Sequence, residues 1–263
     1  MRSTLAIVRK ELEVYFTTPI AYVVLMLVVF LSSLVFNGAL DAYRYLSLRA
    51  LSLGGDVSGQ LNLTDLVLSR VYAWVGVWVL LAAPFLSMRL FAEEKRARTF
   101  ELLMTVPVRP IQIVLGKYLA ALATLSVAIV LALAYPLALA LTARATGGGS
   151  AVEWQTVATG LAGVVLLAAM ALAVGTFVSA LTDSMAVAAL AAFFLLAGLA
   201  LLPLLAVTAE GPLKDIASAL SPVQHLVPFV SGKVELKSVV YFLSFTALGL
   251  YLTDRAVEGH RWI

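Results

Sequence analysis

Cysteine is absent from this chain of 263 residues, and histidine occurs only twice. Without cysteine, the chain has no disulfide, no thiolate metal ligand and no thiol nucleophile. His225 and His260 stand far apart and belong to no His-Glu-x-x-His pattern, so the usual ligand set of a catalytic metal is missing. We expect no metal site and no metal-dependent catalysis in this chain.

The short motifs of common enzymes are missing as well. The only Gly-Lys pairs are Gly116-Lys117 and Gly232-Lys233, and neither has the earlier glycine or the following serine or threonine of a phosphate-binding loop. The Gly-x-Ser-x-Gly turn of serine hydrolases does not occur. The chain is therefore predicted not to be an enzyme, with no catalytic residue and no cofactor-binding residue of its own.

Charged residues are also scarce, at 13% of the chain, whereas 62% of its residues are hydrophobic and its mean hydropathy is +1.00. This composition is too apolar for a soluble core with a polar surface, and it indicates a polytopic membrane protein. The net charge of +3 comes without a basic cluster that contains aromatic residues, so we expect no nucleic acid partner.

Six windows of the sequence are apolar over about the 20 residues that a helix needs to cross a bilayer. They are residues 20–40, 66–87, 118–141, 156–180, 185–207 and 238–253. We predict an all-α polytopic membrane protein, with one domain of six transmembrane helices, both termini on one side and no cleavable signal peptide. Residues 213–230 allow a seventh entry into the membrane, but Pro222, His225 and Pro228 argue against a full span there.

The basic residues predict the orientation of the chain. If the termini are cytoplasmic, that side holds Arg2, Arg9, Lys10, Arg89, Lys95, Arg96, Arg98, Arg109, Lys117, Arg255 and Arg261. The opposite side then holds Arg44, Arg49, Arg70, Arg144, Lys214, Lys233 and Lys237. Because Lys and Arg accumulate in cytoplasmic loops, we predict a multi-pass protein of the cell (inner) membrane with both termini in the cytoplasm.

The interiors of the predicted spans carry no charge. Asp65, Arg70 and Asp183 all fall at the ends of spans. Ion-coupled carriers bind their driving ion with charged groups inside the membrane, although each such group costs about 2.5 to 3.5 kcal/mol at a helix centre. The sequence therefore disfavours an ion-coupled carrier.

Residues 1–19 form the first of two amphipathic segments on the predicted cytoplasmic side. An apolar stripe at helical spacing is made by Leu5, Val8, Leu12, Tyr15 and Phe16, with Arg2, Arg9, Lys10 and Glu13 beside or opposite it. Such a pattern predicts a helix that lies in the membrane interface and ends at Thr17-Thr18-Pro19. It is either a plain membrane anchor or a contact surface for a partner.

Residues 88–117 form the second segment, a polar loop between two long apolar windows. Its charged run is Glu93-Glu94-Lys95-Arg96, and a solvated surface explains that run by itself. The apolar residues that follow are Phe100, Leu102, Leu103 and Val106, with Pro107 and Pro110 marking a turn. These apolar side chains fit the groove of a soluble partner, with the charges setting the register of docking.

Several stretches together resemble the ABC-2 type permeases. The clearest are residues 89–108 (RLFAEEKRARTFELLMTVPV) and 113–117 (IVLGK), which look like the signature loop of that family. Residues 9–22 (RKELEVYFTTPIAY) resemble its gliding-motility and nitrous-oxide-maturation branch. So do the later positions Ser221-Pro222, His225, Phe229, Gly232, Tyr241-Phe242 and Leu252-Thr253. The resemblance covers essentially the whole chain.

The resemblance implies a six-helix membrane subunit that works with two ABC ATPase subunits and a second permease chain, identical or related. ATP and Mg²⁺ are then expected in the partner ATPase and not in this chain. The implied ATPase-coupling residues are Glu93, Glu94, Arg96, Arg98, Thr99, Phe100, Glu101, Leu102 and Leu103. The implied interface helix contains Leu5, Arg9, Lys10, Leu12, Tyr15 and Phe16, and residues 208–237 are implied to form an external re-entrant hairpin.

One position departs from the family pattern, because Arg98 replaces the usual glycine before Thr99. If that glycine breaks a helix, the local geometry differs here, or Arg98 adds a contact of its own.

Other functions stay open at the level of sequence. The main alternative is an ATP-independent carrier or a structural scaffold subunit of a membrane complex, and a periplasmic or extracytoplasmic partner fits the long external loops. The small residues Gly160, Gly163, Ala168, Ala171 and Gly175 suit either pairing of two chains or packing within one. The apolar spans do not identify a substrate.

Overall fold

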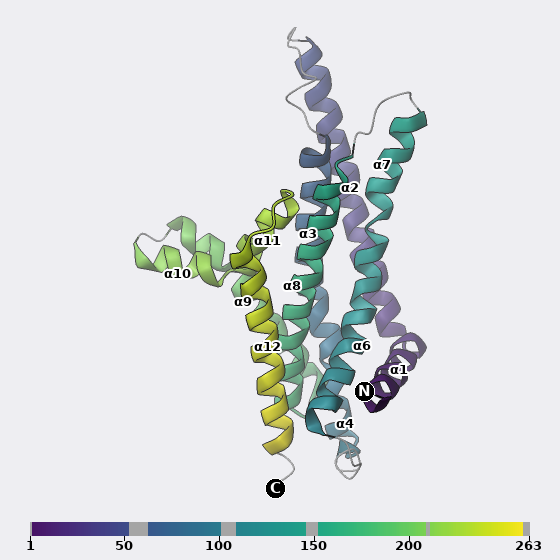
Figure 1. Cartoon of the computed structure of the whole chain (residues 1–263), viewed down its shortest axis with the longest axis vertical. Helices are drawn as coiled ribbons and strands as arrows, with labels where there is room; N and C mark the ends of the chain where they lie inside the picture. Colours follow the sequence, from purple (N-terminus) through teal and green to yellow (C-terminus); the bar gives the residue numbers. More distant parts are fainter. Residues whose placement is uncertain (1, 53–62, 101–108, 146–151, 209–210, 260–263) are drawn as a thin grey trace.

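A computed structural model describes residues 2–52, 63–100, 109–145, 152–208 and 211–259. Over these residues the chain forms a bundle of helices that contains no strand (Figure 1). The prediction of an all-α fold is therefore confirmed.

Six helical stretches of the described chain are long and apolar enough to cross a membrane, as predicted. They run over Pro19–Ala50, Thr64–Arg96, Pro110–Ala143, Trp154–Leu181, Met185–Leu204 and Leu236–Gly259. Several extend beyond the predicted windows. The helix of the first span, for example, continues to Ser52 and has 34 residues. At 1.5 Å per residue it is about 51 Å long, well over the thickness of a bilayer core.

The helices follow one another in a simple order along the chain. They are α1 (Arg2–Thr17), α2 (Pro19–Ser52), the π-helical turn η1 (Thr64–Leu68), α3 (Ser69–Ser87), α4 (Arg89–Arg96), α6 (Pro110–Leu131), α7 (Ala134–Ala145), α8 (Trp154–Leu181), α9 (Met185–Thr208), α10 (Pro212–Leu220), α11 (Pro222–Val230) and α12 (Leu236–Gly259). The N- and C-termini lie toward the same end of the bundle as α4 (Figure 1).

The third span is broken where α6 meets α7. Helix α6 ends at Leu131 and α7 begins at Ala134. Pro136 explains this break, because proline has no N–H to donate to the carbonyl of Ala132, and its ring crowds that carbonyl. Tyr135 secures the new direction by donating a hydrogen bond to the Val29 carbonyl of α2, at 3.0 Å.

Helix α8 is the centre of the bundle and packs against α3, α4, α6, α9, α11 and α12. Neighbouring side chains press directly on its glycines. A Cβ atom at Gly163 would lie 2.5 Å from Cβ of Phe229 in α11, and one at Gly160 would lie 3.0 Å from the ring of Tyr72 in α3. The five small residues of this span are all buried within the chain, so they serve internal packing.

The two short helices before α12 form a hairpin, with α10 projecting from the side of the bundle (Figure 1). His225 of α11 holds this hairpin to α12. Its Nδ1 is 3.1 Å from Oγ of Ser238, its Nε2 is 3.0 Å from the Ala219 carbonyl, and its ring stacks on Tyr241 with centroids 4.1 Å apart. Entry of residues 208–237 into the membrane stays a prediction.

The packing of α8 predicts that two Gly→Ala substitutions in helix interiors differ in their effect on stability. We expect Gly163→Ala to destabilise the protein by about 1 to 3 kcal/mol, because its methyl group overlaps Phe229. The matched control is Gly198→Ala in α9, where a Cβ atom meets nothing within 4 Å. Thermal unfolding of both variants in the same detergent tests this, and an equal unfolding temperature would contradict the close approach at Gly163.

Candidate coupling site

Helix α4 is the centre of the candidate site, at the end of the bundle that holds both termini (Figure 1). It continues from α3 after a single turn residue, Met88, which lies between Ser87 and Arg89. Its apolar residues Leu90, Phe91 and Ala92 are buried in the bundle. Polar side chains from three other helices, α1, α6 and α8, hold it.

A lysine joins three of these helices through two short ion pairs. Nζ of Lys117 in α6 lies 2.9 Å from Oε1 of Glu11 in α1 and 2.8 Å from Oε1 of Glu94 in α4. Only 3% of the lysine side chain is exposed, against 12% for Glu11 and 18% for Glu94. Lys117 Nζ also lies 5.6 Å from the centre of the Phe91 ring. We call these three charged residues the lysine triad.

The lysine triad requires all of its members, because it is largely removed from water. Moving a single charge into a protein interior costs several kcal/mol, and opposite charges in hydrogen-bond contact offset that cost. Two carboxylates around one ammonium group leave one negative charge in excess. The site therefore favours additional donors near Glu94, whose Oε2 is buried and has no hydrogen-bond partner in the described part of the chain.

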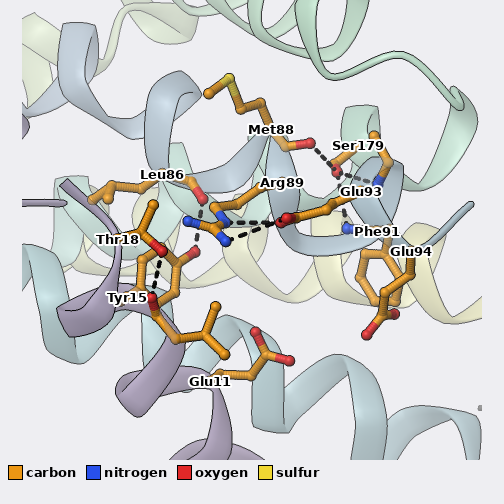
Figure 2. A network of polar contacts seen from close by, with 12 residues as sticks. Glu11, Tyr15, Thr18, Leu86, Met88, Arg89, Phe91, Glu93, Glu94 and Ser179 are labelled. Carbon is orange, nitrogen blue, oxygen red and sulfur yellow. Dashed lines mark hydrogen bonds and ion pairs between the residues drawn. The ribbon is translucent and has the colours of Figure 1, made fainter. Parts of the chain in front are cut away.

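Arg89 and Tyr15 form a second connection between α1 and the junction of α3 with α4 (Figure 2). The Tyr15 hydroxyl donates a 2.7 Å hydrogen bond to the Leu86 carbonyl, and burial raises the pKa of Tyr15, which keeps this donor protonated. The Arg89 guanidinium lies 5.7 Å from the centre of the Tyr15 ring and donates from Nε to Glu93 at 3.0 Å. Arg89 is only 10% exposed, and its Nη1 has no partner among the described residues.

Ser179, near the C-terminal end of α8, caps the start of α4. Its hydroxyl donates to the Met88 carbonyl at 2.9 Å and accepts from the backbone N–H groups of Phe91 and Ala92, at 3.1 and 3.2 Å (Figure 2). These N–H groups belong to the first turn of α4, which has no intrahelical acceptor of its own. One turn earlier, a Cβ atom at Gly175 would lie 2.1 Å from Oγ of Ser87. Helix α8 therefore contacts the junction of α3 and α4 directly.

Lys95 makes a second contact between α4 and the end of α8. Its Nζ donates to the Ala180 carbonyl at 2.6 Å and lies 4.0 Å from Oδ1 of Asp183, in the short connection to α9. A cation is favoured at this position, because the last carbonyl groups of a helix carry partial negative charge. The two contacts by Ser179 and Lys95 hold α4 along its length.

Helix α4 ends in a Schellman motif with a residue in the left-handed conformation. Arg98 has a φ angle of 56°, its N–H donates to the Lys95 carbonyl at 3.1 Å, and the N–H of Thr99 donates to the Glu94 carbonyl at 3.0 Å. Glycine normally occupies this position, because a side chain in the left-handed region costs about 1 kcal/mol. The helix therefore ends as a glycine would end it, although Arg98 stands there.

The structure places the predicted coupling residues in different environments. Glu93 and Glu94 are ion-paired, Arg96, Arg98 and Thr99 are exposed, and Glu101, Leu102 and Leu103 lie outside the described residues. Phe100 is 7% exposed and packs against Phe91, with ring centroids 6.5 Å apart. In this structure the Phe100 side chain belongs to the core of the chain and is not available to a partner.

The predicted interface helix α1 is described over most of its length. Leu5, Arg9, Lys10 and Phe16 are exposed, Leu12 is half-buried and Tyr15 is buried. Tyr15 therefore faces the bundle, whereas Leu5 and Phe16 keep apolar surface on the outside.

Sequence reasoning missed the residues that connect the helices. Glu11, Arg89, Ser179 and Lys117 carry the polar contacts, and none was proposed as a site residue. The prediction began the third span at Tyr118, whereas α6 begins at Pro110 and contains Lys117. The sequence contained an indication of this. A long apolar window follows Lys117 directly, and a helix that continues from that window toward the N-terminus includes the lysine.

A polar groove lies between α1 and α4, beside the lysine triad. Its volume is about 350 Å³. It is lined by Lys10, Glu11, Val14, Arg89, Glu93, Glu94, Ala97, Thr99 and Lys117. The groove is large enough for side chains of a partner to approach the buried charges.

A separate question is metal binding. In the described part of the molecule, no group of three or more His, Asp or Glu side chains could hold a metal ion.

The lysine triad predicts a strong effect of removing its cation. We expect Lys117→Met to destabilise the protein by about 3 kcal/mol, because two carboxylates then stay buried without their partner. Adding Glu11→Gln and Glu94→Gln to this variant should restore part of the loss. The control is Lys10→Met, an exposed neighbour, which should change stability by less than about 0.5 kcal/mol. Equal unfolding temperatures of the two single variants would contradict the assignment.

Comparison with known proteins gives one family. A search of curated proteins found no match. The model of a family described as ABC-2 family transporter protein matches residues 58–252, which is more than half of the chain. The match includes α3, α4, α6 and α8, the helices that form most of the candidate site. Together with the six apolar helices, it shows that this multi-pass membrane protein belongs to the ABC-2 transporter family.

Proposed function

We propose that this chain is the permease subunit of an ABC transporter and that α4 is the helix through which a separate ATPase subunit moves it. The observation that carries the proposal is the setting of α4. Buried polar contacts tie it to α1, α6 and α8, while its last residues are exposed at the end of the bundle. A force applied to those exposed residues reaches three helices at once.

The proposal places ATP hydrolysis in another polypeptide, and the lack of a phosphate-binding loop in the sequence supports this. In the proposal, ATP and Mg²⁺ bind the ATPase subunits, and this chain binds neither. ATPase subunits of this type close as a pair, so the complex contains two of them and two permease chains. Movement of the paired ATPase subunits then becomes a rearrangement of the membrane helices.

Helix α1 supports the proposal as a second contact at the membrane surface. Leu5 and Phe16 expose apolar surface at 68% and 40%, which suits the boundary between lipid head groups and acyl chains. Glu11, on its inner side, connects α1 to α4 through Lys117. Movement of α4 would therefore also move α1 along the membrane surface.

The finer assignments belong to the same proposal. The end that holds α4 and both termini is proposed to be cytoplasmic, in the inner membrane, because most Lys and Arg residues lie there. The sequence resemblance proposes the gliding-motility and nitrous-oxide-maturation branch. In the proposal, the coupled movement either exports a substrate or transmits force to a partner on the outer side of the membrane.

The alternative is an ATP-independent carrier or a scaffold subunit. Both predict that no ATPase binds the chain. The decisive experiment isolates the chain from its native membrane, identifies co-purifying proteins by their phosphate-binding loop, and measures whether the reconstituted chain stimulates their ATP hydrolysis. Absence of such a protein, or hydrolysis that is unchanged by the chain, would reject the permease assignment.

The capping role of Ser179 predicts a variant that binds its ATPase but transmits movement poorly. In Ser179→Ala the N–H groups of Phe91 and Ala92 lose their acceptor, which loosens the junction of α3 with α4 by about 1 kcal/mol. We expect unchanged affinity for the ATPase and a stimulation of ATP hydrolysis that falls several-fold.

Two comparisons make this test specific. Ser179→Thr keeps the hydroxyl and should retain most of the stimulation. Thr159→Ala removes a hydroxyl that bonds only to the backbone of α8 itself, and it should have no effect on stimulation. If Ser179→Ala stimulates like the unmodified chain, α8 does not receive movement through this contact.

A further inference from the structure

The charged residues of α1 and α4 divide into paired and unpaired groups. Every carboxylate of the two helices has a cation partner within the chain: Glu11 and Glu94 bind Lys117, Glu93 binds Arg89, and the exposed Glu13 binds Arg9. The cations Lys10, Arg96 and Arg98 are exposed, and none of them forms an ion pair within the described residues. We call these three exposed cations the basic tip.

The basic tip is a local surface around the end of α4. Arg96 is the last residue of α4, and Arg98 follows two residues later, after Ala97. Lys10 reaches the same place from α1, because it lines the polar groove together with Ala97 and Thr99. The fold therefore pairs the carboxylates of both helices within the chain and leaves these three cations unpaired at the surface of the described residues. Their charge is available to a partner that approaches the end of α4.

Arg98 is kept at this surface in an unfavourable backbone conformation. Its φ angle of 56° is one that side chains rarely adopt, and glycine would end the helix without strain. The exposed side chain forms no hydrogen bond or ion pair with the described residues in return. A strained residue with an exposed, charged side chain indicates a role outside the chain itself.

We propose that the basic tip binds a cluster of carboxylates on the ATPase subunit and that Arg98 determines the affinity of this contact. The proposal rests on the proposed function, and it adds the chemistry of the partner surface. Arginine suits the task, because its planar guanidinium binds a carboxylate through two parallel hydrogen bonds. Charges at the rim of an interface mainly accelerate association and make it sensitive to salt.

Anionic lipids are the other negatively charged surface in reach of a cytoplasmic cation, and the position of the tip argues against them. The end of α4 lies nearer than α1 to the end of the bundle at which the C-terminus is marked (Figure 1). Helix α1 is the element that we place at the membrane surface. With α1 at the membrane surface, the proposal places the end of α4 farther from the bilayer than α1, on the side from which a soluble subunit would dock.

The test measures binding of the purified ATPase subunit, obtained from the native complex, to the full chain in nanodiscs. Arg96→Glu combined with Arg98→Glu should weaken binding at low salt about tenfold or more and flatten the dependence of affinity on salt. Arg255→Glu is the matched control, because it reverses an exposed arginine that already pairs with Glu258, and it should leave affinity unchanged. Unchanged unfolding temperatures establish that the variants are folded.

Two substitutions at one position separate the side chain from the backbone. Arg98→Gly removes the strain and the guanidinium together, so the unfolding temperature should rise by about 2 to 4 °C while affinity for the ATPase falls several-fold. Arg98→Ala removes the guanidinium alone and should weaken binding equally, without the gain in stability. If Arg98→Gly binds as tightly as the unmodified chain, position 98 serves only to end the helix, and the proposal is wrong.

The lipid composition of the nanodiscs completes the test. Weakened binding of the charge-reversed chain in both phosphatidylcholine discs and discs with phosphatidylglycerol supports a protein partner. An effect that occurs only with phosphatidylglycerol assigns the basic tip to lipid and overturns the proposal, and equal affinity of all variants in both discs does the same. If the unmodified chain binds no ATPase at all, the proposed function itself fails.

Discussion

The arrangement of the candidate site depends on one buried ammonium group. Lys117 holds Glu11 of α1 and Glu94 of α4 within 3 Å, so that three helices from separate parts of the sequence meet at one charge. Without it, neither carboxylate has a described cation to offset its burial. The contact adds a connection to α4 where α1 already packs on α6.

The rest of the bundle converts that local contact into a connection across the molecule. Helix α8 approaches its neighbours closely because it has glycine at the contact points, and Ser179 near its end supplies the acceptor that the first turn of α4 lacks. Polar bonds and close packing thus act at the same junction, where Gly175 meets Ser87. A junction of this kind has few alternative arrangements, which suits an element that transmits movement.

The ion pairs within the chain decide which charges of α4 stay unpaired at its surface. The run Glu93-Glu94-Lys95-Arg96 has two acidic and then two basic residues, and its two carboxylates and Lys95 bind within the chain, whereas Arg96 is exposed. The groove next to this end is lined by Glu94 and Arg89, each of which has one buried polar atom without a hydrogen-bond partner among the described residues. The site is therefore complete enough to hold α4 in place and open enough to accept further polar contacts.

The sequence by itself determined the class of the protein, the number and order of its membrane helices, and the absence of the common catalytic motifs. Each depends on residues close together in the chain, since hydropathy and short motifs are local properties. Only the tertiary structure decided that Lys117 is buried with Glu11 and Glu94, that Phe100 faces the core, that Ser179 caps α4 and that the glycines of α8 serve internal packing. These outcomes depend on which helix faces join residues about 100 positions apart, and local patterns carry no record of such pairs.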